Sequence, residues 1–491
     1  MAIKKVAKQK IVAKRVDPEL LLKQRMAELA KLPHGKDVNL DEAVAFQKSL
    51  PDSRIWWKVM KNLEKEGRMS VFPRAGTPIL EDMISLCQEL RESGVVLIPM
   101  TTDSYTRTGQ HEKVAEVMKE VKRTKKPLLN GFPIFYYPLK DLRRIVENVD
   151  AAFSPRAAGG DYAIAAGATT GGAGIGFLHF GSYAKNQPVR ELVKQGMERQ
   201  STTGWWADQG VILCTDLHGW LPGAPFPLTV GIVGLIIEAV TSAMQGQKAL
   251  YPLVHCMGNM VQDMAWIRLA PRIIREYLDK FGFKDTMIVG CCPCQTPLFP
   301  VARHLGGAFA YLCYIAMVGS LAKCNAVDLR SIDEGAGIPT TETHSVSYRA
   351  AKWMFDVIRE QNIEIDLKGV DLEEKMAERE VRAIMDKLLD LGDGDIAEGT
   401  AQAVESGVLD SPWSPNSAVK DDVLGFRDVN GACRYLDFGN LPIPEDIKDF
   451  HRAKKAEREA KEGKKVDFYT AVSDLWSLSK GKIVGLPPYD K

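Results

Sequence analysis

The chain has 491 residues, of which 45% are hydrophobic and 26% are charged, and its formal net charge is +1 at pH 7. These proportions are typical of a folded globular protein with room for one large domain and a smaller one. The near-neutral charge argues against general nucleic-acid binding, which needs a basic face. Nine cysteines are too few for a disulfide scaffold, so we expect a reducing, cytoplasmic compartment.

Residues 1–68 begin with a basic tail, "MAIKKVAKQKIVAKR", and continue as a helical extension. The tail lacks the apolar core of a secretion signal, and we expect it to be solvated. From Met69 onward, β-rich runs alternate with stretches of helical length, such as Leu80–Glu92 and Asp263–Phe281. The runs are "MSVFPRAG", "VVLIPMTTDSYTR", "PLLNGFP", "AAFSPRAAGG", "GVILCTDLHG", "ALYPLVHCMGN", "TMIVGCCPCQ" and "NAVDLRSIDEGAG".

Strands that alternate with helices indicate βαβ units and a parallel sheet. Eight such units over residues 69–362 predict a closed (β/α)₈ TIM barrel. After this region the pattern changes to a helical stretch, Asp371–Leu391, and then to short strands such as "CRYLDFGN". We therefore expect residues 363–491 to form a smaller C-terminal α+β domain.

Two apolar stretches, Leu221–Ile237 and Leu305–Ala322, carry no charge and have to be weighed as membrane spans. The first contains three prolines, and the second contains three glycines and two tyrosines. No asymmetry of basic flanking residues marks a topology for either stretch. Buried helices of a large core are the better interpretation, and we expect no membrane association.

A glycine-rich stretch, "TTGGAGIGFLHFGSYAKN", covers residues 169–186. A dinucleotide fingerprint that starts at Gly172 would need a glycine where Phe177 stands, and the chain contains no P-loop pattern. Glycine here either fills a tight turn or lets the backbone pass close to something bulky. The stretch is therefore not predicted to bind a nucleotide.

Three arginines fall at the ends of predicted strands: Arg74, Arg107 and Arg156. The carboxyl ends of barrel strands share one mouth, where such folds place their active sites. Guanidinium groups gathered there need anions, and their planar fork suits carboxylates. The pattern predicts a small dianion, most simply a dicarboxylate; for any one of these arginines alone, a structural ion pair is the alternative.

No Ser-His-Asp order and no metal-ligand spacing stands out. The cysteines of "CCPC", which are Cys291, Cys292 and Cys294, could bind a metal or oxidise, but small buried side chains are the simpler interpretation. A site that grips carboxylates without a strong base indicates that a cofactor performs the difficult step.

Several motifs, in order from near Pro33 to near Pro487, resemble those of the epsilon subunit of glutamate mutase (methylaspartate mutase). They are "PRAG" (73–76), "YTR" (105–107), "LLNGFP" (128–133), "YAKN" (183–186), "GNMVQD" (258–263), "GIPT" (337–340), "RYLDFGN" (434–440) and "GKIVG" (481–485). The resemblance implies a (β/α)₈ barrel that isomerises glutamate to 3-methylaspartate by a radical route with adenosylcobalamin.

The resemblance also implies roles for single residues, which are carried over by position. Substrate contacts fall on Arg74, Arg107, Arg156, Tyr183 and His179, and catalytic roles on Glu334, Arg330, Tyr183 and His179; the cofactor side falls on Gly76, Asn130, Arg330, Glu334 and Ile338.

The sequence departs from the family at three of these positions. Ala173 stands where the family has a glutamate for the substrate's ammonium group, His179 replaces a tyrosine, and Arg330 replaces a lysine. An alanine cannot accept a charge-assisted hydrogen bond. The substrate is therefore either glutamate or a related dicarboxylate that lacks or alters the α-amino group.

The family's cobalamin is held mainly by a small partner subunit with a D-x-H-x-x-G motif. The nearest pattern in this chain, "DLHGWL" at 216–221, lacks the final glycine and is interpreted as accidental. The resemblance therefore implies a separate cobalamin-binding subunit and a dimer of the large chain. The alternatives are a barrel aldolase or lyase without cobalamin and a non-catalytic dicarboxylate-binding protein.

Overall fold

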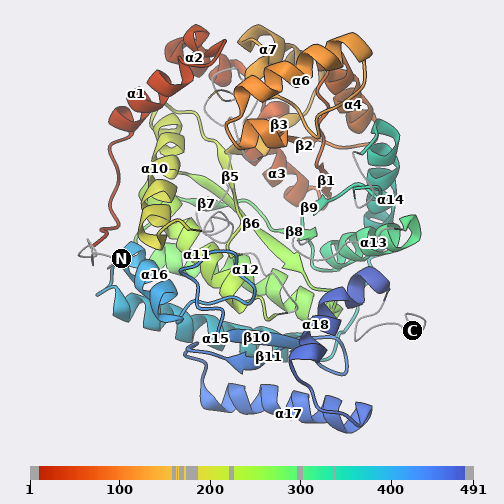
Figure 1. Ribbon diagram of the computed structural model, residues 1–491. Helices are drawn as coiled ribbons and strands as arrows, with labels where there is room; N and C mark the ends of the chain where they lie inside the picture. The colour runs from red at the N-terminus through yellow and green to blue at the C-terminus, as the bar shows by residue number, and fades with distance from the viewer. Residues whose placement is uncertain are drawn as a thin grey trace.

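The computed structural model describes residues 10–156, 162, 164, 171–172, 186–220, 226–295, 302, 304–334 and 339–481. Parallel strands lie at the centre, helices surround them, and an antiparallel hairpin lies at one end (Figure 1). The strands are β1 (Ser70–Pro73), β2 (Leu97–Thr101), β3 (Ala152–Arg156), β4 (Gly171–Gly172), β5 (Cys214–Leu217), β6 (Ala249–Cys256), β7 (Met287–Ile288), β8 (Cys292–Gln295), β9 (Ala326–Leu329), β10 (Val423–Arg427) and β11 (Cys433–Phe438).

Among the described residues, three α-helices precede β1, and from β1 to α14 strands and helices largely alternate, with three helices between β2 and β3; four more helices lie beyond α14. The helices are α1 (Pro18–Leu29), α2 (Leu40–Ser49), α3 (Trp56–Lys65), α4 (Leu80–Glu92), α5 (Ser104–Arg107), α6 (His111–Thr124), α7 (Leu139–Asn148), α10 (Val189–Asp208), α11 (Thr229–Met244), α12 (Met260–Lys280), α13 (Leu305–Leu321), α14 (Thr341–Glu360), α15 (Val370–Leu391), α16 (Ile396–Ser406), α17 (Glu445–Glu462) and α18 (Phe468–Ser477).

The central sheet has the strand order β1-β9-β8-β6-β5-β4, with β7 paired to β6, and all of its pairs are parallel. β2 and β3 form a second parallel pair, and a bridge between Ala75 and Met100 links the end of β1 to β2. The first and last of these strands, β1 and β9, are therefore direct neighbours. The protein is an α/β fold built on a parallel sheet, and the carboxyl ends of β1 and β9 lie at the same edge.

The predicted strand at "PLLNGFP" is not a strand in the structure, where this run contributes only a bridge between Thr102 and Phe132. Gly131, at φ 126°, turns the backbone out of an extended course, and Pro133 has no N–H to donate to a ladder. The other seven runs each contain a strand. A short strand that was not predicted, β4, lies within the glycine-rich stretch and pairs with β5.

Helix α3 packs its apolar side beneath the sheet. Trp56 is fully buried, and its ring lies 5.1 Å from that of Phe72 in β1 and 6.3 Å from that of Tyr251 in β6. The helix fits this place because Trp56, Met60 and Leu63 recur at helical spacing and are all buried. The N-terminal extension thus covers the amino-terminal ends of the strands.

The two apolar stretches form α11 and α13 in the main. α11 is buried along nearly its whole length, whereas α13 is buried on one side and leaves Leu305 54% exposed. α13 therefore differs from the expected fully buried helix. Among the described residues, no helix is long and apolar enough to cross a membrane.

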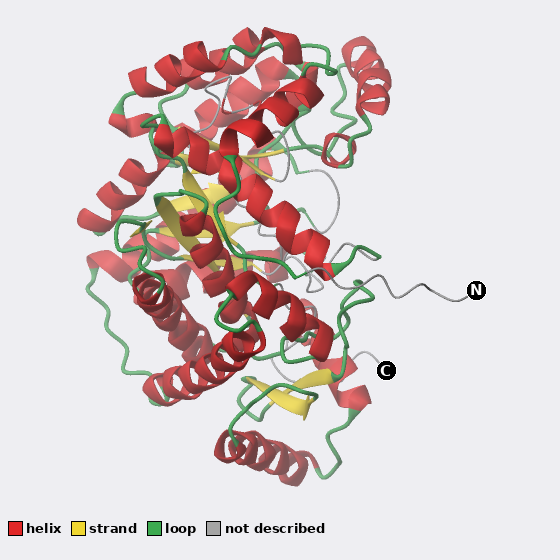
Figure 2. Cartoon of the chain, turned by 90° about the vertical axis from the view of Figure 1, so that its left-hand side faces the viewer, coloured by secondary structure: helices red, strands yellow, loops and turns green. Residues whose placement is uncertain are grey.

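Beyond α14, the chain covers one end of the molecule. α15 packs against α11 and α12, and α16 packs against α10. The hairpin of β10 and β11 follows, with α17 against β11 and α18 against β10; Figure 2 shows the hairpin and α17 at the lower end of the molecule.

Candidate active site

Two arginines and two carboxylates meet at the carboxyl ends of β1 and β9, and we call them the arginine–carboxylate cluster. Arg74 directly follows β1, and its Nε lies 3.2 Å from Oδ1 of Asp328, a β9 side chain that is only 1% exposed. Arg330 directly follows β9, and its Nε lies 3.6 Å from Oε1 of Glu334. The parallel register, in which Phe72 pairs with Asp328, holds both strand ends side by side.

Arg330 and Asp328 of the cluster are largely shielded from water. Burial lowers the pKa of Arg330, and the nearby charge of Arg74 lowers it further. Nε of Arg330 is buried and has no hydrogen-bond partner among the described residues. Because a guanidinium in such a place is stabilised by added negative charge, the cluster is suited to an anionic ligand.

A histidine and a cysteine extend the site across the next two strands. His255 in β6 pairs in register with Cys294 in β8, and the sulfur lies 3.3 Å from Nδ1. Burial lowers the pKa of His255 to about 3, with the charges of His218 and Arg74 contributing, so the ring is neutral at physiological pH. Sequence reasoning missed His255; its place at the end of a β-rich run was the only available signal.

All nine cysteines are free thiols. Cys291, Cys292 and Cys294 are buried, and a hydrogen bond with Cys324, together with burial, raises the pKa of Cys291 well above its ordinary value. No cluster of three or more potential metal ligands occurs within the described part of the chain. The Cys291 thiol is therefore protonated, and all three cysteines are side chains of the interior.

The segment "DLHG" carries a second polar group at the end of β5. Nε2 of His218 lies 3.1 Å from Oδ2 of Asp216, and Glu238 of α11 accepts hydrogen bonds from the backbone N–H groups of His218 (2.8 Å) and Gly219 (3.0 Å). The imidazole of His218 thus contacts a carboxylate of its own chain, and the interpretation of the motif match as accidental stays a prediction. Burial raises the pKa of Glu238 to about 8, so this carboxyl carries a proton at neutral pH.

A pH test follows from Glu238. Between about pH 4.5 and about pH 8, Glu238 keeps its proton in the folded protein but has lost it in the unfolded chain. Its contribution to the free energy of unfolding is therefore complete below this window and is lost as the pH rises through it. The Glu238→Gln variant keeps an acceptor for both N–H groups but cannot ionise. We expect the wild type to lose a few kcal/mol relative to Glu238→Gln between pH 5 and pH 9, measured by urea unfolding. Glu112→Gln changes an exposed carboxylate and is the control, which should follow the wild type. If the wild type and Glu238→Gln lost the same unfolding free energy between pH 5 and pH 9, the raised pKa of Glu238 would be wrong.

Arg107 lies at the end of α5 rather than at the end of a strand, and its side chain is exposed. The expectation that it closes the second strand is therefore corrected: β2 ends at Thr101, and Asp103 then caps α5 by accepting a hydrogen bond from the N–H of Thr106. Arg107 remains in the connection that follows the carboxyl end of β2.

Gly76 and Asn130 lie on neighbouring segments. A Cβ built on Gly76 would lie 2.6 Å from the carbonyl oxygen of Thr101 and 2.9 Å from Cα of Gly131, so only glycine allows this approach. The contact places the exposed Asn130, which precedes Gly131, beside the end of β1. These two predicted cofactor-side residues are thus brought together.

We expect Gly76→Ala to destabilise the protein by about 1–3 kcal/mol, because backbone atoms of two segments would have to move apart. Gly306→Ala is the matched control: its nearest neighbour would lie 3.7 Å away, and a helical alanine should be neutral or stabilising. Thermal unfolding of both variants measures the difference. Equal melting temperatures would show that the approach at Gly76 is not tight.

The remaining predicted residues are described only in part. Arg156 ends β3, where it pairs with Thr101, and the structure describes its backbone position alone. Ala173, His179, Tyr183 and Ile338 lie outside the described residues.

A parallel α/β fold with paired arginines and carboxylates at one end of its strands defines a class of enzyme that binds small anions at the sheet edge. The sequence profile of the family described as "Methylaspartate mutase E chain (MutE)" matches residues 50–487, and the chain belongs to this family. It is therefore a mutase, which is an isomerase, and the resemblance stated from the sequence motifs is confirmed.

Curated relatives match nearly the whole chain. The "Glutamate mutase epsilon subunit" of Desulfitobacterium hafniense is 32% identical over 478 residues, which are 96% of this chain and 98% of the relative. The protein of the same description from Haloarcula marismortui is 33% identical and covers 93% of both chains. That from Treponema denticola is 31% identical and covers 96% of this chain and 98% of its own.

Proposed function

We propose that this chain is the catalytic large subunit of an adenosylcobalamin-dependent mutase that rearranges the carbon skeleton of a dicarboxylate by a radical route. The observation that carries the proposal is the arginine–carboxylate cluster at the ends of β1 and β9, in a member of a mutase family. Glutamate, rearranged to 3-methylaspartate, is the first substrate to test because the relatives are described as glutamate mutase subunits.

The charge balance supports a doubly negative substrate. Within the cluster, Asp328 and Glu334 offset the charges of Arg74 and Arg330. Arg107 ends α5 after β2, and Arg156 is the last residue of the neighbouring β3, so we infer that both belong to the same mouth. We infer that the two carboxylates of the substrate meet these arginines, with Arg74 held in position by Asp328. Paired hydrogen bonds from a guanidinium fix both the place and the direction of a carboxylate.

The residues present fit the adenosyl part of the cofactor. The tight backbone approach at Gly76 brings the exposed Asn130 beside the end of β1, where it can face a nucleoside. Glu334 is 27% exposed, so its carboxylate can accept hydrogen bonds from ribose hydroxyls while Arg330 holds it. When bound, adenosylcobalamin supplies the radical that abstracts a substrate hydrogen. The chain's own part is to hold substrate and nucleoside in a fixed relation and to exclude water.

Tyr183, His179 and Ile338 complete the proposed site by their place in the family's motifs: the first two toward the substrate, the third toward the cofactor. A specific observation favours the second candidate, a dicarboxylate without the α-amino group: Ala173 replaces the carboxylate that would pair with an ammonium. His179 in place of a tyrosine alters the same side of the pocket.

We also propose that the parallel strands close into a (β/α)₈ barrel over residues 69–362. The neighbouring β1 and β9, the bridge from Ala75 to Met100 and the pairing of β4 with β5 support closure. Residues 1–68 would be the helical extension and residues 363–491 the smaller α+β domain, with its hairpin and α17.

We propose that a small cobalamin-binding subunit docks over the carboxyl ends of the strands and that the large chain forms a homodimer. The word "subunit" in the relatives' descriptions supports a multi-chain enzyme. The free thiols support a reducing compartment such as the cytoplasm.

The test is reconstitution of this chain with a cobalamin-binding subunit and adenosylcobalamin, followed by an assay on glutamate and on a panel of short dicarboxylates. We expect isomerisation that requires both the coenzyme and the partner subunit. If this enzyme turned over glutamate as fast as its relatives do, the hypothesis of a substrate with an altered α-amino group would be wrong. If turnover did not need the coenzyme, or if no dicarboxylate were turned over, the proposed adenosylcobalamin-dependent reaction would be wrong.

A further inference from the structure

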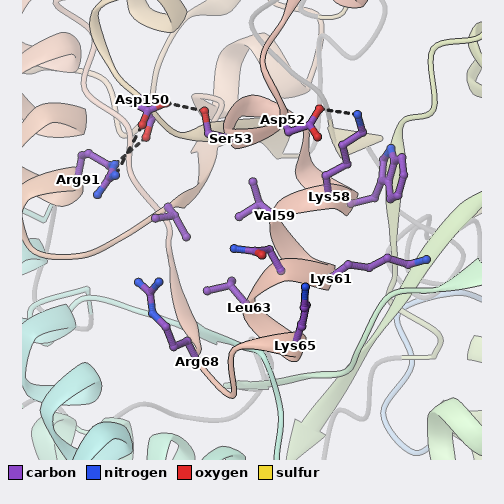
Figure 3. Close-up of a pocket in the computed structure, with 13 residues that line it drawn as sticks. Asp52, Ser53, Lys58, Val59, Lys61, Leu63, Lys65, Arg68, Arg91 and Asp150 are labelled. Atoms are coloured by element: carbon purple, nitrogen blue, oxygen red, sulfur yellow. Dashed lines mark hydrogen bonds and ion pairs between the residues drawn. The ribbon is translucent and has the colours of Figure 1, made fainter.

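A pocket of about 660 Å³ lies at the opposite end of the strands from the arginine–carboxylate cluster (Figure 3). Its walls come from α3, from the turn at Asp52–Arg54 before it, and from the residues that lead into β1, β2 and β3, which are Arg68, Val96 and Asp150. This volume is within the usual range for pockets that bind small organic molecules. Neither the family nor the proposed mutase reaction accounts for it.

The pocket has an excess of positive charge. Five cations line it, from Lys58, Lys61, Lys65, Arg68 and Arg91, against the carboxylates of Asp52 and Asp150. Three of these cations have carboxylate partners: Lys58 with Asp52 at 2.5 Å, Arg91 with Asp150 at 3.7 Å, and Arg68 with Glu66 on the rim at 2.8 Å.

Two ammonium groups, those of Lys61 and Lys65, have no carboxylate partner in the described part of the chain. Nζ of Lys61 contacts only the sulfur of Met287 (3.2 Å) and the ring of Trp57, and Lys65 has no hydrogen-bond or ion-pair partner there. The two lysines are four residues apart on α3, so they face the same way and repel each other. An anion that bridges them would remove this repulsion.

An aromatic ring and apolar side chains adjoin these charges. Trp57 is half-buried, and Nζ of Lys58 and of Lys61 lie 5.7 and 5.6 Å from the centre of its ring. Val59, Leu63 and Val96 add apolar wall. The pocket therefore offers a stacking surface and an anion-binding surface side by side, and it is larger than a free phosphate would require.

We propose that this pocket binds a nucleoside polyphosphate, with the base against Trp57 and the phosphates between Lys61 and Lys65. An aromatic ring stacks on a base of any kind, and ammonium groups act as point charges toward phosphate oxygens. The site precedes β1, whereas Arg74 follows it, so a bound nucleotide would contact the segment that leads into the strand before Arg74. The proposal stands independently of the mutase reaction.

The experiment is isothermal titration calorimetry of the full chain with ATP, with adenosine and with inorganic triphosphate. We expect ATP to bind at least about tenfold more tightly than either of the other two. The variant Lys61→Gln/Lys65→Gln should weaken ATP binding by at least about tenfold, since it removes both unpaired charges. Lys119→Gln/Lys461→Gln, which removes two exposed lysines on α6 and α17, is the matched control and should bind as the wild type does.

Three outcomes would overturn the proposal. The first is no heat of binding with ATP. The second is equal affinity for ATP and triphosphate, which would mean an anion site that does not bind a base. The third is ATP binding that is weakened as much by the control variant as by Lys61→Gln/Lys65→Gln. Both variants change exposed side chains, so their circular dichroism should match the wild type. If it does not, hydrogen exchange of the wild type decides: ATP must protect the amides of α3, and absence of that protection rejects the site.

Discussion

Replacement of Arg74 by alanine is expected to lower kcat/KM of the reconstituted enzyme by about two to three orders of magnitude, with whichever dicarboxylate it isomerises. The change removes a guanidinium from the arginine–carboxylate cluster. It also removes the ion pair that this guanidinium makes with the carboxylate of Asp328, which is 1% exposed. Arg74→Lys should recover part of the loss at most, because an ammonium keeps the charge but cannot make two parallel hydrogen bonds.

The loss must be separated from a loss of stability, since an unpaired buried carboxylate also destabilises the fold. The double variant Arg74→Ala/Asp328→Asn removes that charge and should restore the unfolding midpoint toward the wild type without restoring activity. Arg144→Ala is the control, because Arg144 makes an exposed ion pair with Glu81. A wild-type kcat/KM in Arg74→Ala, or activity recovered in the double variant, would show that Arg74 has no role with the substrate.

The sequence was sufficient for those parts of the site that depend on local chain order. Arg74 could be predicted because the β-rich run before it ends in a proline and the strand stops there. Arg107 is displaced because Asp103 caps a short helix, a local hydrogen bond that the run "TTDSYTR" did not reveal. Both outcomes were decided within a few residues of the arginine concerned.

The parts that could not be predicted depend on contacts between distant segments. Asp328 becomes the partner of Arg74 only because β9 pairs with β1, and His255 meets Cys294 only through the register of β6 and β8. No periodicity carries such information. For Arg74, the structural ion pair that the sequence left open as an alternative is present, because Asp328 supplies the anion.

The pocket beneath the sheet was also beyond prediction. Lys58, Lys61 and Lys65 follow helical spacing, which is typical of a solvated helix face. Only the fold shows that Trp56 anchors α3 against the strands and that a pocket adjoins this helix.

The second large effect is expected in the C-terminal part, where a buried ion pair joins α17 to α18. Arg458 and Asp474 are 1% and 0% exposed, and two hydrogen bonds link them, from Nη1 to Oδ2 at 2.5 Å and from Nη2 to Oδ1 at 3.0 Å. Nη1 also donates to the carbonyl oxygen of Arg427 in β10. Arg458→Met leaves Asp474 buried and charged, and we expect a loss of about 3–5 kcal/mol in unfolding free energy.

Arg452→Met is the matched control on the same helix. Arg452 is 53% exposed and pairs with Glu445 and Asp449, so its loss should cost no more than about 1 kcal/mol. Differential scanning calorimetry of both variants measures the contrast. The expected loss of stability in Arg458→Met comes from the buried carboxylate of Asp474, which no longer has its arginine. Adding Asp474→Asn should therefore recover much of the lost unfolding free energy. Two results would contradict this: equal losses of stability in Arg458→Met and Arg452→Met, or a further loss when Asp474→Asn is added. Either would show that Arg458 and Asp474 stabilise the contact of α17 with α18 by packing and not by charge.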